Sequence, residues 1–412
     1  MNRGTPRIGS RWWIVVGCTL GLMFGTGPLI QFSFGVFIKP VSEAFHADRG
    51  QVSLALLVAL CLCGLLTPVV GQLADRFGVR RIGAPMIALF AISIGLVGWV
   101  STSMWLYIGC YGLAGIFGAG QTPLIYAKAI TASFDTKRGL ALGLAMAGVG
   151  LGTALVPRLA QQFVSVWGWR HAYVALGAVT LAVALPALLF LVREEPAPSR
   201  IVARDIEVQG MTGSEALRSR LFWTLAAVFF LVAAALAGIM AHIVPMMTDR
   251  GVPVQTAALA LSTGGIALIA GRLVAGYFLD LVFAPYVAVF FFALPLLGIG
   301  ILLTSSSVAL SVAAAILIGI SIGAEVDLIA YLQSRYFGLR RFGAIYGYLL
   351  AIFMVGSGVG PFAMGVVYSH FSSYSPALIG FGVCLACACA GMLTFPPYAF
   401  SHDDRGAKAS TD

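Results

Sequence analysis

Apolar stretches of about 20 residues alternate with short polar or glycine-rich breaks along almost the whole chain. This is the length an α-helix needs to cross the hydrocarbon core of a bilayer. The pattern predicts twelve membrane helices, six on either side of one longer polar gap: Trp12–Ile38, Val52–Leu73, Ile82–Val100, Trp105–Ile130, Leu140–Phe163 and Ala172–Val192, then Phe222–Met247, Thr256–Phe278, Val287–Leu303, Val308–Leu332, Ala344–Ser369 and Ala377–Phe395.

The longer gap, Glu194–Ser219, contains prolines, acids and bases and is predicted to be a linker. The domain organisation expected from this is an N-terminal six-helix bundle over residues 1–193, a cytoplasmic linker over 194–219, a C-terminal six-helix bundle over 220–400 and a cytoplasmic tail over 401–412.

Special backbone residues repeat between the two halves. At an offset of 205, Pro40, Gly71 and Asp75 match Pro245, Gly276 and Asp280; at 204, Gly139, Gly143, Gly152 and Pro157 match Gly343, Gly347, Gly356 and Pro361. The halves are therefore predicted to share one fold, related by an axis along the membrane normal, with a central site near the midplane between them.

Two glycine-rich faces are expected to let a helix of the other half approach closely. They comprise Gly139, Gly143, Gly148, Gly150 and Gly152 in the fifth predicted helix, and Gly343, Gly347, Gly356, Gly358 and Gly360 in the eleventh.

Composition supports a polytopic membrane protein. The 412 residues are 59% hydrophobic and 10% charged, and the mean hydropathy is +0.95, which excludes a soluble globular chain. The seven cysteines lie in or at the edge of the predicted helices, where they pack as small apolar residues, so no metal site and no cofactor are expected.

The distribution of basic residues predicts the topology. Eighteen of the 25 Lys and Arg residues fall in segments on the side of the N-terminus, and five fall on the opposite side. Because cytoplasmic loops are enriched in bases, both termini are expected in the cytoplasm of a multi-pass protein of the bacterial inner (plasma) membrane. The same bias accounts for the net charge of +9, so nucleic-acid binding is not expected. No cleavable signal is expected either, since the first apolar segment is too long.

Arg272 is the most informative residue, because it lies inside the otherwise uncharged stretch Leu261–Phe278. Placing a guanidinium there costs roughly 2.5 kcal/mol or more, so it is expected to face the protein interior. Two interpretations stay open: a structural ion pair with an acid on a neighbouring helix, or a binding site for an anionic substrate, whose carboxylate suits the fixed donors of Arg.

The segment from Gly71 to Arg81, which contains Asp75, Arg76, Gly78, Arg80 and Arg81, resembles the signature loop of the major facilitator superfamily. In the second half, only the counterparts of Gly71 and Asp75 are present, as Gly276 and Asp280. The segments 34–40, 137–141, 168–170 and 335–338 are similar to the bacterial branch that includes monocarboxylate porters and oxalate/formate exchangers. The resemblance implies a major facilitator fold that works by alternating access, with Arg76, Arg80 and Arg81 among the gating residues.

The same resemblance makes Arg272 the anchor for the substrate carboxylate. The exchangers' second cation corresponds to Phe353, and the lysine and aspartate of animal monocarboxylate porters correspond to Phe32 and Leu268. One buried cation neutralises one carboxylate, which favours a monovalent anion over oxalate.

Two acids in the tenth predicted helix are candidate proton carriers. Counting about 1.5 Å per residue places Asp327 at the depth of Arg272. The resemblance implies that the eighth and tenth helices adjoin, so the two residues are expected to pair without substrate and to separate when a carboxylate competes. Asp327 would then accept a proton, which would couple anion and proton transport. Glu325 is the alternative carrier, and a permanent Arg272–Asp327 bridge is the alternative to coupling.

Other polar residues could contribute to the site. His242, near the end of the seventh helix, could titrate at physiological pH, although a lone histidine there also suits a hydrogen-bonded interface. Gln31, Gln121, Tyr126 and Tyr331 could add hydrogen bonds to the substrate. Lys128 either extends toward the membrane surface or contacts substrate.

The sequence therefore predicts a non-enzymatic secondary transporter, working as a monomer in the lipid bilayer, that carries a small organic anion, specifically a monocarboxylate, together with a proton. No nucleotide-binding loop, metal-ligand set or nucleophile triad is apparent. Efflux of a larger organic anion or drug and a membrane sensor without transport are the alternatives.

Overall fold

The computed structural model describes residues 8–134, 138–192, 210–338 and 340–399. The predicted tail, Lys137 and most of the predicted linker lie outside these residues. The described part is helical and contains no strand, apart from one isolated bridge between Gly210 and Gly338.

The first bundle contains six membrane-spanning units, three of them interrupted or bent. Its elements are α1 (Ile8–Met23), the π-helical η1 (Gly27–Phe32), α2 (Phe34–Phe45), α3 (Arg49–Phe77), α4 (Val79–Val100), α5 (Met104–Gly118), the 3-10 turn η2 (Ala119–Gln121), α6 (Pro123–Ser133), α7 (Arg138–Pro186) and η3 (Ala187–Leu191). The first predicted span is α1, η1 and α2 in succession, and the fourth is split at η2 because Pro123 cannot donate a helical hydrogen bond.

The second bundle has six uninterrupted spans preceded by a short helix. Its elements are α8 (Gly213–Arg218), α9 (Arg220–Asp249), α10 (Val254–Leu281), α11 (Ala284–Thr304), α12 (Val308–Phe337), α13 (Phe342–Phe371) and α14 (Ser375–Leu393). The helix α8 starts with a capping box formed by Thr212 and Glu215. The backbone N–H of Thr212 donates to the Glu215 carboxylate and lowers the pKa of that group.

Ten continuous stretches among the described residues are long and apolar enough to span a membrane. One of them, Leu140–Leu191, covers two predicted spans, because α7 consists of two helices that meet at a kink at Gly168, within the expected break at residues 164–171. Gly168, with a φ of 76°, has a non-helical backbone that favours glycine and separates the two helices. The ten stretches account for eleven predicted spans, because Leu140–Leu191 covers two of them. The split fourth span is not among the ten and is the twelfth, so the prediction of twelve spans agrees with the structure.

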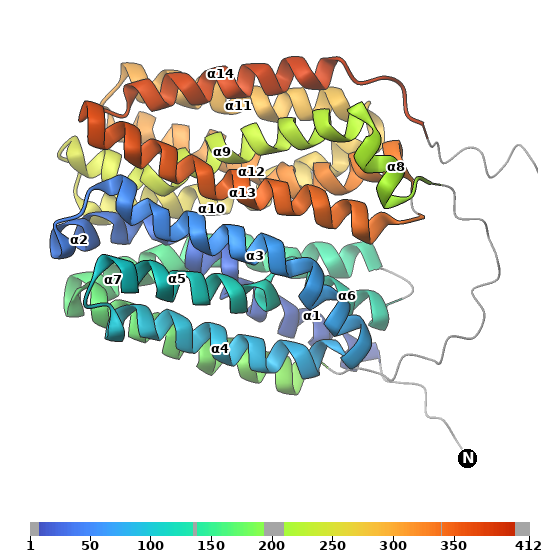
Figure 1. The fold of residues 1–412 in the computed structure, drawn as a ribbon, viewed down its shortest axis with the longest axis horizontal. Coiled ribbons are helices and arrows are strands. Elements are labelled where there is room, and N and C mark those ends of the chain that lie inside the picture. The colour runs from blue at the N-terminus through green and yellow to red at the C-terminus, as the bar shows by residue number, and fades with distance from the viewer. Residues whose placement is uncertain (1–7, 135–137, 193–209, 339, 400–412) are drawn as a thin grey trace, which may run out of the picture.

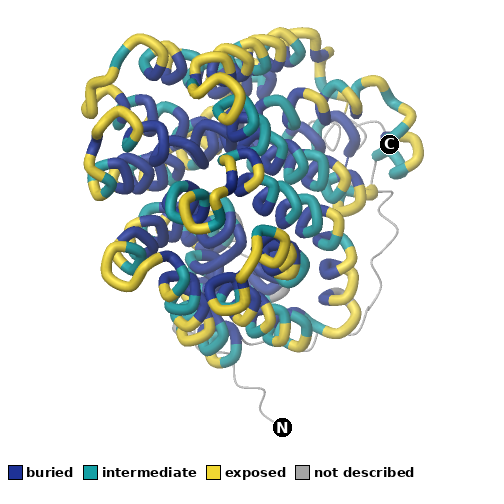
Figure 2. Tube along the Cα trace, turned by 60° about the vertical axis from the view of Figure 1, so that its left-hand side comes forward, coloured by how far each residue is buried: buried dark blue, intermediate teal, exposed yellow. Residues whose placement is uncertain are grey.

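The two bundles have separate buried cores and pack side by side (Figure 1). They meet where α3 packs on α13, α7 on α10 and α2 on α9. We call the end where α1 begins and α14 ends the proximal end, and the end with the turn between α2 and α3 the distal end. Exposed residues cover the outside of both bundles, while buried residues fill the interiors (Figure 2).

The glycine faces of the fifth and eleventh predicted helices contact helices of their own bundle as well as of the other bundle. The prediction that they face the other half is therefore only partly correct. Gly150 meets Ile269 and Gly358 meets Leu57 across the bundle interface. Gly148 and Gly152 instead pack against α1, while Gly356 and Gly360 pack against α9 within the second bundle. A helix with small residues on several sides packs closely against more than one neighbour.

Candidate functional site

Arg272 on α10 and Asp327 on α12 form an ion pair inside the second bundle. The Arg272 Nε lies 3.0 Å from Asp327 Oδ2, and their side chains are 14% and 36% exposed. The two helices approach closely here because Gly271 and Gly323 bring them together: an added Cβ on either would lie within 2.1 Å of a backbone oxygen of the facing helix. The pairing expected from equal depth is therefore present.

Arg272 also reaches the other bundle. Its Nη1 donates to the backbone carbonyl of Met146 on α7, at 3.2 Å. One guanidinium thus contacts an acid of its own bundle and a carbonyl of the opposite bundle. Tyr346 on α13 lies within electrostatic range of both Arg272 and Asp327. Neither Met146 nor Tyr346 was a sequence candidate, because a backbone acceptor and a tyrosine on another helix carry no local pattern.

Glu325 has a different environment from Asp327. It is 3% exposed, and its Oε1 has no hydrogen-bond partner among the described residues. A carboxylate buried without a partner is costly, so this surrounding accommodates the neutral acid. The structure therefore separates the two candidate acids into a paired one and an unpaired one.

The predicted substrate contacts do not all converge on Arg272. The Tyr126 hydroxyl donates to Gln121 Oε1 at 2.6 Å beside the break in the fourth span, and Gln121 Nε2 has no partner among the residues that the structure describes. Gln31 lies in η1 and is half-buried. Tyr331 points toward the proximal end, where its hydroxyl accepts from Arg335 Nη2 at 3.0 Å. Its contact is thus with Arg335, one turn further along α12.

The signature segment lies at the proximal end between α3 and α4. Gly71 is buried, and its carbonyl accepts from Lys128 Nζ at 2.5 Å. Gly78 ends α3 with a φ of 98°, a value that favours glycine.

The charged residues of this segment differ in their surroundings. Arg76 lies over the Phe77 ring, Arg81 is exposed and Arg80 is partly buried. The side chain of Asp75 lies outside the described residues. The second-half counterparts Gly276 and Asp280 are both exposed.

The three positions that carry charges in the related families are apolar and buried here. Phe32, Leu268 and Phe353 are 5%, 3% and 7% exposed. Phe32, from the first bundle, packs with the core of the second. No cation from these positions accompanies Arg272.

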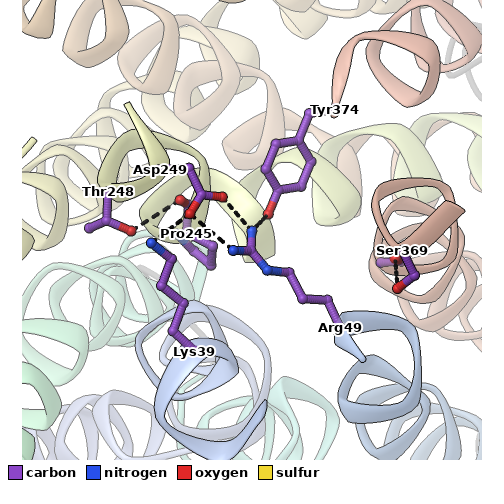
Figure 3. Close-up of polar contacts among 8 residues, drawn as sticks. Lys39, Arg49, Pro245, Thr248, Asp249, Ser369 and Tyr374 are labelled. Atoms are coloured by element: carbon purple, nitrogen blue, oxygen red, sulfur yellow. Dashed lines mark hydrogen bonds and ion pairs between the residues drawn. The ribbon is translucent and has the colours of Figure 1, made fainter. Parts of the chain in front are cut away.

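A cluster of charged and aromatic side chains joins the bundles at the distal end (Figure 3). Asp249 of α9 accepts from Lys39 Nζ at 2.6 Å and from two nitrogens of Arg49 at 2.6 and 3.0 Å. Arg49 also donates to the Tyr374 hydroxyl and lies 3.9 Å from the centre of the Tyr368 ring. We call Lys39, Arg49, Asp249, Tyr368 and Tyr374 the distal cluster.

The distal cluster was not predicted, because its members come from five separate segments and its charged residues lie outside the predicted apolar spans. Burial raises the pKa of Tyr374, which stands in the turn before α14, so its hydroxyl remains protonated as a neutral partner of Arg49. Asp249 serves two cations with one carboxylate, which makes it the central residue of the cluster.

His242 lies below the distal cluster on α9 and is fully buried. Its Nε2 is 3.2 Å from Ser53 Oγ of the first bundle and 3.0 Å from the Pro361 carbonyl of the second. Its Nδ1 has no partner among the described residues. It is an interface residue, as one of the two sequence interpretations proposed.

Among the described residues, no group of three His, Cys, Asp or Glu side chains could hold a metal ion. The Arg272 guanidinium offers charge pairing and hydrogen bonding, so it can exchange the Asp327 carboxylate for another carboxylate.

Comparison with known proteins agrees with this architecture. The family model described as Major Facilitator Superfamily matches residues 19–347 and 243–411. The MFS-type transporter YcxA of Bacillus subtilis (strain 168) is 30% identical over 287 residues, which are 68% of this chain and 67% of that protein. Human monocarboxylate transporter 11 is 30% identical over 68% of this chain and 59% of its own length. The oxalate:formate antiporter of Oxalobacter formigenes is 27% identical over 56% of this chain and 54% of its own length.

The fold is also found among solved structures. A bacterial homologue of the human lysosomal transporter Spinster, in an inward-facing and occupied conformation, superposes with a TM-score of 0.73 at 18% identity, over 94% of this chain and 97% of that one. The chain is a multi-pass membrane transporter rather than an enzyme, and it belongs to the major facilitator superfamily.

Proposed function

We propose that the protein carries a small monocarboxylate together with a proton, by alternating access, and that Arg272 binds the substrate carboxylate. The observation that carries the proposal is the ion pair of Arg272 with Asp327 inside membrane-spanning helices. Relatives named as monocarboxylate transporters and as an oxalate:formate antiporter support a carboxylate as cargo.

The proposed exchange at Arg272 follows from its contacts. An incoming carboxylate competes with Asp327 for the guanidinium, and the released acid takes up a proton because a lone carboxylate is poorly accommodated there. Since Phe32, Leu268 and Phe353 add no second cation, one negative charge on the substrate is favoured over two.

We further propose that the proximal end faces the cytoplasm and that the described conformation is closed at its outer, distal end. The distal cluster holds the two bundles together there. Toward the proximal end, an added Cβ on Gly143 or Gly343 would meet no atom of the described residues within 4 Å. The positive-inside distribution of Lys and Arg supports this orientation.

Uptake into proteoliposomes tests the proposal. Labelled lactate, pyruvate, acetate and oxalate are offered with and without an inward proton gradient. We expect gradient-stimulated uptake of a monocarboxylate by the wild-type protein and at least a hundredfold loss with Arg272→Gln, since a charge-assisted pair contributes about 3 kcal/mol.

Asp327→Asn provides the test of coupling. It leaves Arg272 available but removes the proton acceptor, so anion exchange is expected to persist while gradient-driven accumulation is lost. Uptake of oxalate alone, or gradient-driven accumulation retained by Asp327→Asn, would contradict the proposed mechanism. Absence of flux for every acid would favour efflux of a larger compound or a sensor.

A further inference from the structure

Two pairs of side chains join α3 and α9 across the bundle interface. Arg49 and Ser53 are four residues apart on α3, and His242 and Asp249 are seven apart on α9, so each pair lies on one face of its helix. Arg49 bonds to Asp249, and Ser53 lies 3.2 Å from His242. Separation of the bundles at the distal end breaks both contacts together.

The contacts of His242 determine its protonation in this conformation. The Pro361 carbonyl can only accept, so Nε2, 3.0 Å away, carries the hydrogen. Nδ1 is then unprotonated, has no partner within the described part of the chain and lies in a side chain with no exposed surface. A second proton on Nδ1 would create a buried cation without an acceptor, which is strongly unfavourable.

The charges around His242 do not change this conclusion. Arg49 on α3 is a cation and opposes a second positive charge, while Asp249 already serves Arg49 and Lys39. The Tyr374 ring lies 5.7 Å from the imidazole, and the Tyr368 ring lies under Arg49. Two more helices, α10 and α12, also pack on α9, and their charged residues all lie in the proximal halves of the helices: Arg272, Asp280, Glu325, Asp327 and Arg335.

We propose that His242 is a proton-binding site that is accessible only when the bundles separate at the distal end, so that external acid stabilises the outward-open form. This rests on the alternating access and orientation proposed above but is independent of the substrate. A solvated imidazole titrates near pH 6.5. If only the open form binds the proton, lowering the external pH from about 7.5 to about 5.5 raises the open-to-closed ratio about tenfold.

The distance between two spin labels at the distal end measures this ratio without any substrate. We choose Ala44→Cys on α2 and Ser306→Cys between α11 and α12, both exposed, in a Cys387→Ala background that removes the exposed native thiol. In lipid nanodiscs the wild-type histidine should give a long-distance population whose ratio to the short one rises about tenfold between pH 7.5 and 5.5. With His242→Gln, whose amide can still donate to Pro361, the ratio should not change with pH.

Two further variants locate the proton. Asp249→Asn should raise the open population at both pH values and keep the pH response, whereas loss of the response would assign the proton to Asp249 and overturn the proposal. His46→Gln removes an exposed distal histidine and should leave the response intact.

A wild-type ratio independent of pH, or a response retained by His242→Gln, would also overturn the proposal that His242 binds the proton. A protein that fails to transport any monocarboxylate but shows the His242-dependent response would refute the substrate proposal alone.

Discussion

Asp327 and Glu325 lie two positions apart on α12 and have opposite surroundings. Side chains at this spacing point roughly 200° apart on a helix. Asp327 is therefore beside Arg272, while Glu325 is buried and its Oε1 has no hydrogen-bond partner in the described part of the chain. The first environment suits an ionised acid and the second a neutral one.

Substitution of the two acids by their amides should separate these environments. Glu325→Gln exchanges one neutral group for another of the same shape, so the free energy of unfolding should change by less than about 1 kcal/mol. Asp327→Asn leaves Arg272 without its counter-charge and should cost about 1–2 kcal/mol, a reduced value because Asp327 is partly exposed. Thermal unfolding in detergent measures both. A larger loss for Glu325→Gln would show that Glu325 is ionised and paired.

Helix pairs depend on glycine at the points where their backbones are closest. Between the bundles, α10 packs on α7 at Gly265, where an added Cβ would lie 2.5 Å from the backbone nitrogen of Ala154. Such a contact leaves no room for a methyl group, so the position of one helix relative to the other is fixed by the glycine.

Gly265→Ala should destabilise the described conformation by about 1–3 kcal/mol, because α10 must move away from α7. The matched control is Gly380→Ala on α14, where an added Cβ meets nothing within 4 Å and where alanine favours the helix slightly. Thermal unfolding and transport rate are measured for both. Equal effects of the two substitutions would contradict the importance of the α7–α10 contact.

At the scale of the whole molecule, the distal cluster connects α2 and α3 of the first bundle to α9, α13 and the turn before α14 of the second. Partly buried charge pairs of this kind contribute more than exposed ones because water screens them less. The cluster is therefore expected to set the balance between the closed and open distal end.

Removing and then exchanging the charges of the Arg49–Asp249 pair tests this role. Asp249→Ala and Arg49→Ala should each increase labelling of Ser53→Cys by an impermeant thiol reagent several-fold, since Ser53 is buried in the closed form. The double variant Arg49→Asp with Asp249→Arg restores opposite charges and should recover part of the protection. If single variants leave labelling unchanged, the cluster does not hold the distal end closed.

Sequence patterning predicted the architecture well, because each membrane helix has to be apolar over its own length. The Arg272–Asp327 pair could also be predicted, since depth follows from counting residues along two helices and the family resemblance implied that these helices adjoin. The distal cluster, the Met146 carbonyl and the surroundings of His242 depend on which helices become neighbours, and no single segment encodes that.

The Arg272–Asp327 ion pair has a consequence for the response to membrane voltage. With no cargo, the two side chains sum to zero charge. With one carboxylate anion and one proton added, the sum is again zero. Moving one uncompensated elementary charge across a potential of about 100 mV changes its free energy by about 2.3 kcal/mol. Neither the empty nor the loaded site carries a net charge, so the membrane potential does not favour movement of either form. Accumulation should therefore follow the pH difference across the membrane and remain the same when the voltage is clamped to zero.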